Sequence, residues 1–178
     1  MKISPMSVEL IDSMGSDLSV VNAARVSFHK FHEKFQDGDE KLINYLAKHG
    51  HWTPFAHAFL SFRIKAPIFV ARQLVKHQVG LAWNEVSRRY VDDEPEFWFP
   101  EVWRGKPVNA KQGSSDISFS LDDTRFYSTD SSNYWMHDHS VLCRYLLEWY
   151  TNAIKEGMAP EQARMMLPQN TMTEWIWS

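Results

Sequence analysis

The segment "KHQVGLAWNEVSRRY" (76–90) gathers cationic, amide, hydroxyl and carboxylate groups in a chain whose net charge is −3. A solvated basic face would also carry cations, but it usually interleaves them with Glu at i, i+4 spacing. Here a single glutamate, Glu85, lies between the cations, together with Gly80, Trp83, Asn84 and Ser87. Arginine binds phosphate through paired hydrogen bonds, and Glu85 can accept from a ribose hydroxyl or a ring N–H. The composition therefore fits a nucleotide site, with a solvated face as the alternative.

Three histidines, His49, His51 and His57, form a second group. Neutral imidazole is a common metal ligand, so a metal-dependent hydrolase is an alternative function. Their spacing across Pro54 matches no recognised ligand pattern, and no cysteine lies near, so we expect no metal. The single cysteine, Cys143, lies in an apolar-rich stretch and is interpreted as a core residue rather than a nucleophile.

The composition of the whole chain limits its class. The 178 residues are 44% hydrophobic and 23% charged, which indicates one globular domain covering 1–178. No apolar run approaches the roughly 18 residues that span a bilayer, and the N-terminus lacks the apolar stretch of a secretory signal. A lone cysteine favours the reducing cytoplasm. The slight acidity argues against a nucleic-acid surface, so we expect a cytoplasmic protein with neither membrane nor nucleic-acid partners.

Helices and strands are predicted from apolar periodicity and from capping and turn residues. The predicted helices cover 16–28, 38–50, 68–78, 130–156 and 160–167. The predicted strands cover 8–11, 58–64, 96–99 and 171–177. A turn is predicted around Pro54, and 91–130 is irregular. In the longest helix the apolar residues at helical spacing are Leu142, Tyr145, Leu146, Trp149 and Ala153.

Four motifs, in the correct order along the chain, resemble the flavin-dependent thymidylate synthases. "NAARVSF" (22–28) is similar to the Ala-Arg-Val-Ser element of that family. "HWTPFAHAFLSFRIKAPIFVARQ" (51–73) is similar to its His-x-Thr-Pro-Phe-x-His strand and the helix that follows. "NEVSRRY" (84–90) resembles its Asn-Glu-x-Ser-x-Arg-Tyr signature, and "GMAPEQARMMLPQN" (157–170) its Pro-x-x-Ala-Arg-x-x-Leu-Pro segment.

Two departures from the family pattern stand out. The family carries Arg-His-Arg and a seven-residue spacer before its serine, whereas this chain has Lys76, His77 and Gln78 and eight residues before Ser87. Lysine keeps the positive charge of arginine but lacks its planar guanidinium group with paired donors, and glutamine has no charge. The family also continues beyond a segment like "NTMTEWIWS" with an arginine for the pyrimidine ring. The resemblance therefore implies that the sequence is shortened at its C-terminus. It is a naturally short form, a trimmed form or a part of a longer chain.

The resemblance implies an α/β (α+β) fold with a central, mainly antiparallel sheet flanked by helices. It implies a methyltransferase-type enzyme that converts dUMP to dTMP, with methylenetetrahydrofolate as carbon donor and FAD, reduced by NADPH, as hydride carrier. It also implies a homotetramer with active sites between subunits. The alternatives are a catalytically impaired homologue that still binds flavin or nucleotide, and the metal-dependent hydrolase.

The resemblance also assigns roles to individual residues. The expected FAD contacts are Thr53, Lys76, His77, Gln78 and Glu85. The expected dUMP contacts are Gln73, Lys76, Glu85, Ser87, Arg89, the backbones of Val86 and Arg88, and Arg164 from another subunit. His51, near the flavin ring, and Ser87 are the expected catalytic residues, with the pyrimidine-activating arginine expected beyond Ser178. Arg25 is expected in the same region.

Overall fold

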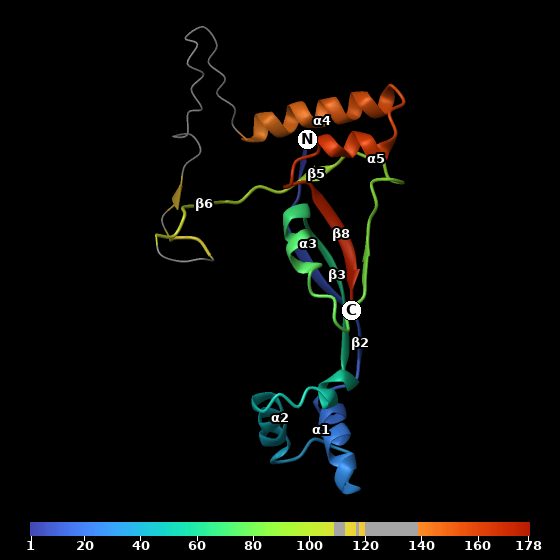
Figure 1. Cartoon of the computed structure of the whole chain (residues 1–178), viewed down its shortest axis with the longest axis vertical. Coiled ribbons are helices and arrows are strands. Elements are labelled where there is room, and N and C mark those ends of the chain that lie inside the picture. Colours follow the sequence, from blue (N-terminus) through green and yellow to red (C-terminus); the bar gives the residue numbers. More distant parts are fainter. Residues whose placement is uncertain (109–112, 117, 120–138) are drawn as a thin grey trace. The chain divides into compact units, whose positions relative to one another are not determined.

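The computed structural model describes residues 1–108, 113–116, 118–119 and 139–178. The chain divides into two compact units whose segments alternate along the sequence (Figure 1). The first unit comprises Met1–Met6, Lys65–Lys76 and Val86–Thr173, and the second comprises Ser7–Ile64, His77–Glu85 and Glu174–Ser178. The segment 76–90 therefore contributes to both units. Among the described residues, no helix is long and apolar enough to cross a membrane.

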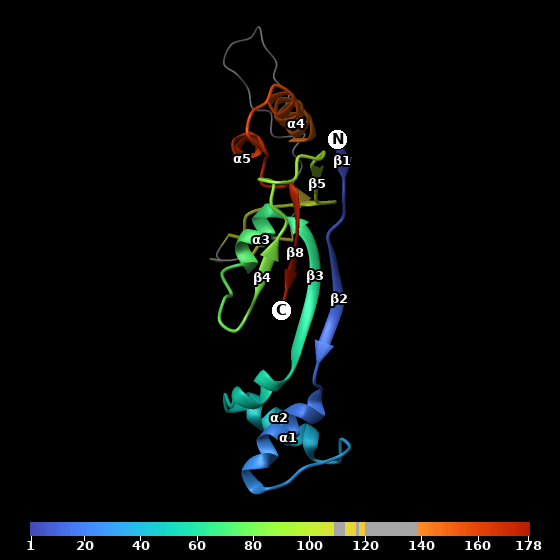
Figure 2. The same cartoon turned by 90° about the vertical axis from the view of Figure 1, so that its right-hand side faces the viewer.

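The second unit contains most of a four-stranded sheet with the strand order β2-β3-β8-β4 (Figure 2). The strands are β2 (Ser7–Met14), β3 (Phe59–Pro67), β8 (Met172–Trp177) and β4 (Trp83–Glu85). Strand β4 runs antiparallel to β8, with Trp83 opposite Trp177 and Glu85 opposite Trp175. The strands predicted at 8–11, 58–64 and 171–177 are confirmed, and so is a mixed α/β fold with an antiparallel sheet. Strand β4 was not predicted.

The helices of the second unit begin and end near residues that suit helix termini. They are α1 (Asp17–Arg25), η1 (Val26–Phe28), α2 (Asp39–Lys48) and η2 (Thr53–His57), the η elements being 3-10 helices. The Ser16 N–H before α1 donates to the Ser19 hydroxyl at 3.1 Å. Gly50, beyond the end of α2, has a φ of +68° that favours glycine. Pro54 lies in the first turn of η2, where only a turn was predicted.

The first unit is built around helix α4 (His139–Lys155). The other helices among its described residues are α3 (Ile68–Leu74), α5 (Pro160–Ala163) and the 3-10 helix η4 (Arg164–Met166). Strand β1 (Lys2–Ile3) pairs in parallel with β5 (Glu96–Phe97), and β6 (Trp103–Arg104) pairs antiparallel with β7 (Ser118–Phe119). The strand predicted at 96–99 is therefore present but shorter. The predicted start of the long helix, 130–138, lies outside the described residues.

The face that α4 buries differs from the predicted apolar face. Leu142, Tyr145 and Trp149 are exposed, and the helix instead buries Cys143, Leu147 and Tyr150, which stand at i, i+4 and i+7. These residues form the core of the first unit with Phe97, Ala163 and Leu167. Apolar side chains occur around most of this helix, so spacing alone could not identify the buried side. The interpretation of Cys143 as a core residue is confirmed, because its side chain has no exposed surface.

Gly15, between β2 and α1 in the second unit, offers a test of how closely the chain there approaches η2. Its φ is +80°, and a Cβ placed on it would stand 2.6 Å from the carbonyl oxygen of His57. Gly38 has a φ of +93°, but a Cβ placed on it would have nothing within 4 Å. A residue with a side chain in this conformation costs about 1–2 kcal/mol from backbone strain alone. We expect Gly38→Ala to lose about that much stability and Gly15→Ala clearly more, measured by denaturant unfolding. Equal losses would contradict the close approach of Gly15 to η2.

Candidate active site

The residues after α3 form a tight turn that leads into β4. The Leu81 N–H donates to the Gln78 carbonyl at 3.2 Å, and Gly80, the third residue of this turn, has a φ of +73°. A positive φ at the third position of such a turn is typical of type II turns and favours glycine there. Lys76, His77 and Gln78 are all exposed before and at the start of the turn. The side chains that could face a flavin are therefore open to solvent in the single chain.

Strand β4 presents Glu85 at the edge of the sheet. The chain is held next to β8 beyond the strand as well, because Ala82 and Ser178 exchange backbone hydrogen bonds of 3.0 and 3.2 Å. The exposed Glu85 carboxylate accepts the indole N–H of Trp83 at 3.1 Å. A negative acceptor at a fixed position on a paired strand suits the recognition of a hydroxyl or a ring N–H.

Ser87 and Arg89 come together in a turn within the first unit. The N–H groups of Tyr90 and Val91 donate to the Ser87 carbonyl at 3.0 and 3.2 Å. The Arg89 Nε donates to the Ser87 hydroxyl at 3.2 Å, and its guanidinium lies 5.1 Å from the centre of the Tyr90 ring. Arg89 is exposed, so its remaining N–H groups are positioned for an anion.

Arg88, the neighbouring arginine, has a different environment. Its side chain is only 17% exposed, and its Nη1 donates to the Asp93 carbonyl at 2.9 Å. Its guanidinium carbon also lies 6.0 Å from the centre of the Tyr150 ring. The side chain thus ties the segment after the signature to α4. From the sequence, only the backbone of Arg88 is expected to contact the nucleotide. This stays a prediction, and the position of the side chain is compatible with it.

Two further predicted ligands of the first unit lie on helices. Gln73 is exposed on α3, and Arg164 is exposed in η4, where its Nε donates to the Glu161 carbonyl at 3.3 Å. Within the described part of the chain, no hydrogen bond or ion pair joins either residue to Ser87 or Arg89. Val86 is also exposed, between β4 and the Ser87 turn.

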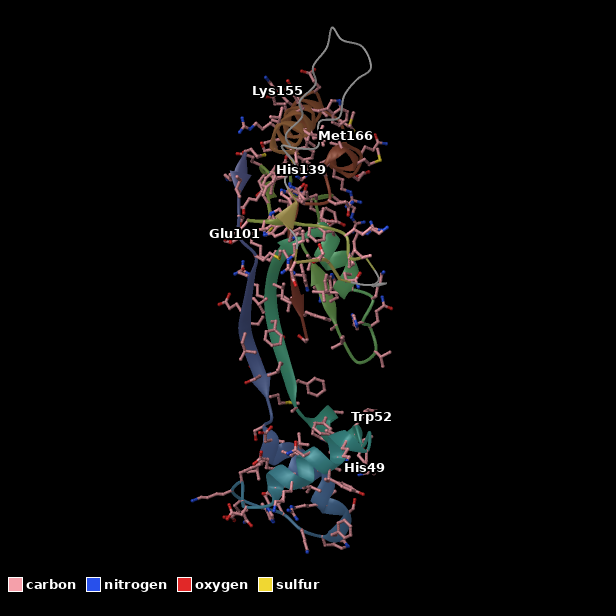
Figure 3. The ribbon with its side chains drawn as sticks, turned by 90° about the vertical axis from the view of Figure 1, so that its left-hand side faces the viewer. His49, Trp52, Glu101, His139, Lys155 and Met166 are labelled. Atoms are coloured by element: carbon pink, nitrogen blue, oxygen red, sulfur yellow. The ribbon has the colours of Figure 1, made fainter. Side chains whose placement is uncertain are left out.

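In the second unit, His51 lies between α2 and η2, and Thr53 is the first residue of η2. The His51 N–H donates to the Leu46 carbonyl at 2.9 Å, and its ring stacks at 6.1 Å and 26° on the ring of Tyr45. The His49 ring lies 4.4 Å from the same tyrosine. Figure 3 shows His49 and Trp52 in this region. Among the described residues, no three His, Cys, Asp or Glu side chains are grouped as metal ligands, so the described chain gives the hydrolase alternative no ligand set.

A buried carboxylate that the sequence did not single out holds α1 and α2 together. Asp39 is fully buried, and its two oxygens accept Arg25 Nη2 at 2.6 Å and the Gln36 N–H at 2.9 Å. His32 Nδ1 lies 3.0 Å from the second oxygen. Arg25, expected near the flavin, is therefore held in a structural network. Burial acts to raise the pKa of Asp39, but these hydrogen bonds outweigh it and lower the pKa from 3.8 to about 2.

An apolar cavity of about 790 Å³ lies in the second unit. Residues of η2, β3, β8 and the turn before β4 line it together with Trp52, and they include Phe55, Phe59, Leu81 and Trp177. Sequence patterns did not indicate it, because its lining comes from separate stretches that look like ordinary core residues. Wide apolar cavities with polar groups at the rim are typical of sites for flat organic ligands.

Comparisons with known proteins give a consistent result. Residues 9–178 match the family model described as thymidylate synthase complementing protein. The chain is 37% identical over 171 residues to the flavin-dependent thymidylate synthase of Thermosipho africanus (strain TCF52B), covering 96% of this chain and 70% of that protein. It is 40% identical over 173 residues to the protein of the same name from Ehrlichia ruminantium (strain Gardel), covering 96% of this chain and 54% of that one.

A solved structure is similar over nearly the whole chain. It is the UMP/dUMP methylase PolB from Streptomyces cacaoi bound with 5-Br dUMP. The TM-score is 0.77 at 31% sequence identity, covering 99% of this chain and 74% of that one. The same protein bound with 5-Br UMP gives a TM-score of 0.70 at 30% identity, covering 98% and 71% of the two chains.

The lowered pKa of Asp39 predicts how stability depends on pH. A carboxyl whose pKa is lower in the folded state stabilises the fold fully above its unfolded value, and this contribution is lost as the pH falls from about 4 towards 2. We expect the free energy of unfolding of Asp39→Asn to fall less steeply over this window than that of the parent. Denaturant unfolding at several pH values measures this. The exposed Asp37→Asn is the matched control, and equal pH slopes for Asp39→Asn and the parent would contradict the network.

Proposed function

Because the chain belongs to the flavin-dependent thymidylate synthase family, we propose that it converts dUMP to dTMP with methylenetetrahydrofolate as the carbon donor. The observation that carries the proposal is the signature turn, where Ser87 and the Arg89 Nε lie 3.2 Å apart directly after the edge strand that presents Glu85. A single domain over 1–178, a cytoplasmic location and a pyrimidine-activating arginine beyond Ser178 stay predictions.

The reaction requires the protein to position the reactants and stabilise charge, and it does not require a protein nucleophile. The pyrimidine C5 forms a bond to the one-carbon unit, the bond from that carbon to the folate nitrogen breaks, and the C5 proton leaves to solvent. Groups that polarise the N3–H make C5 electron-rich enough to attack, so a cysteine is not required. This agrees with the buried position of Cys143. FAD, when bound, supplies the hydride that completes the methyl group, and NADPH restores reduced FAD.

The side chains expected around FAD are chemically suited to its phosphates and ring edge. Lys76 brings a positive charge, and His77 and Gln78 bring N–H donors, all exposed in consecutive positions. Thr53 adds an exposed hydroxyl at the start of η2. Lysine acts on phosphate as a point charge and lacks the fork of arginine, so we expect a functional but weaker hold on FAD than the Arg-His-Arg pattern gives.

Some of the expected nucleotide ligands contact the base or the sugar, and others contact the phosphate. Glu85 accepts hydrogen bonds, and Ser87 and Arg89 donate them from one preformed turn. Gln73 and the backbones of Val86 and Arg88 complete this side of the site. Arg164, exposed in η4, binds the phosphate of a nucleotide held by a neighbouring subunit.

The proposal includes a homotetramer with active sites between subunits. Most of the expected ligands are exposed in the single chain, including His51, Thr53, Gln73 and Arg164. A site that binds a dinucleotide, a nucleotide and a folate must exclude water from the reacting atoms. Exposed ligands therefore need a second surface to cover them, and another copy of the chain is the partner proposed.

A catalytically impaired homologue is the second candidate, and Lys76 and Gln78 favour it because they replace the two arginines of the signature. The two candidates separate when binding and turnover are measured on one preparation. A protein that binds FAD and dUMP but forms no dTMP with NADPH and methylenetetrahydrofolate supports the impaired homologue. Because a similar methylase acts on UMP and dUMP, both nucleotides belong in the assay.

The proposal predicts flavin binding. On titration of the purified protein with FAD, we expect the visible flavin bands to shift and the flavin fluorescence to change to saturation, because the expected site shields the ring from water. Chromatographic detection of dTMP then tests turnover. The absence of any bound-flavin band at saturating FAD would overturn the proposal.

The two adjacent arginines give a matched pair of variants. Arg89→Ala removes a charged donor that faces solvent, so we expect dUMP binding weakened by about 10- to 100-fold with little change in stability. Arg88→Ala removes the bond to Asp93 and the packing on Tyr150, so we expect lower stability and only a small change in affinity. Calorimetric titration and thermal unfolding measure the two effects, and the reverse pattern would contradict these assignments.

A further inference from the structure

Trp83 lies at the start of β4 within a cluster of three tryptophans. Its ring stacks on the ring of Trp175 with 4.4 Å between centroids and 19° between planes. It also meets the edge of the Trp177 ring at 5.8 Å and 68°. Trp175 is almost completely buried, so the cluster is anchored in the sheet. Stacked and edge-to-face aromatic pairs fix the orientation of the rings as well as adding stability.

The three indole N–H groups have different environments. Among the described residues, the N–H groups of Trp175 and Trp177 have no hydrogen-bond partner. The Trp83 N–H donates to the Glu85 carboxylate at 3.1 Å. Trp83 and Glu85 are two positions apart on β4, so their side chains leave the same face of the strand. Through this hydrogen bond, the anchored Trp83 ring restricts the orientation of the Glu85 side chain.

We propose that Trp83 is a positioning residue that holds the Glu85 carboxylate in the orientation needed to bind the uridylate nucleotide. An exposed glutamate on an edge strand samples several rotamers, and ordering them on binding costs free energy. A hydrogen bond from a fixed indole reduces that cost before the ligand arrives. This inference rests on the proposed function for the role of Glu85, but the contact itself is independent of it.

The contact is tested without any ligand, by nuclear magnetic resonance of protein labelled with ¹⁵N at tryptophan. The Trp83 indole signal is identified by its absence in Trp83→Phe, and the Trp177 signal by its absence in Trp177→Phe. We expect Glu85→Gln to shift the Trp83 indole signal strongly, because the acceptor loses its charge, and the Trp177 signal much less. An unmoved Trp83 signal would overturn the proposal, whether or not the protein binds a nucleotide.

The effect on the ligand is tested by affinity for dUMP. Trp83→Phe keeps an aromatic ring but removes the indole N–H together with the five-membered ring that carries it. We expect binding to weaken by about threefold to tenfold, in the range for one hydrogen bond. Trp177→Phe is the matched control, because its N–H has no partner among the described residues. Thermal unfolding of both variants checks that the sheet is intact.

A double-mutant cycle separates positioning from a general structural effect. If Trp83 acts through Glu85, then Trp83→Phe causes no further loss of affinity in a Glu85→Gln background. Additive losses would contradict the proposal. If the parent protein binds no uridylate while Glu85→Gln still shifts the Trp83 signal, the positioning contact stands and the proposed function fails. If the parent binds dUMP and the signal does not move, the proposed function stands and the inference about Trp83 fails.

Discussion

The antiparallel pairing of β4 with β8 is the interaction on which the candidate site depends. β4 is only three residues long, Trp83–Glu85, and a strand this short is not stable unless its partner is fixed. β8 provides this, because Trp175 is buried opposite Glu85 and the pairing is extended by the backbone bonds between Ala82 and Ser178. The pairing sets the position of Glu85, and the turn that brings Ser87 to Arg89 follows two residues later. A shift of the pairing by one residue would move each side chain of β4 to the opposite face of the sheet.

Polar residues with similar sequence signals have either structural or ligand-binding roles, and their environments distinguish them. Arg25 and Arg88 are largely buried and bound to groups of their own unit, Asp39 and the Asp93 carbonyl. Arg89 and Arg164 are exposed residues. Buried charges require partners, since an unpaired charge in the interior is costly, whereas a charge that binds a ligand has to stay accessible before the ligand arrives.

Much of the fold could be predicted from the sequence, because capping residues, glycines and apolar spacing mark its elements locally. Ser16 and Gly50 indicated the ends of α1 and α2, and 58–64 and 171–177 were correctly assigned to strands. Strand β4 and the burial of Asp39 could not be predicted. Strand β4 forms because of a partner about ninety residues away, and Asp39 resembles an ordinary acid in the first turn of a helix. In the site, the motifs indicated which residues to examine, but the separate environments of Arg88 and Arg89 and the bond from Trp83 to Glu85 depend on tertiary packing.

We propose that this chain forms the new bond at C5 of dUMP although Lys76 and Gln78, expected to contact FAD, replace the two arginines of the family signature. Release of tritium from dUMP labelled at C5 measures that step directly, because the C5 hydrogen leaves only after the new carbon–carbon bond forms. With FAD, NADPH and methylenetetrahydrofolate present, we expect steady release of tritium to water, and none when the folate is omitted. A preparation that binds FAD and dUMP at saturation yet releases no tritium under these conditions would contradict the claim.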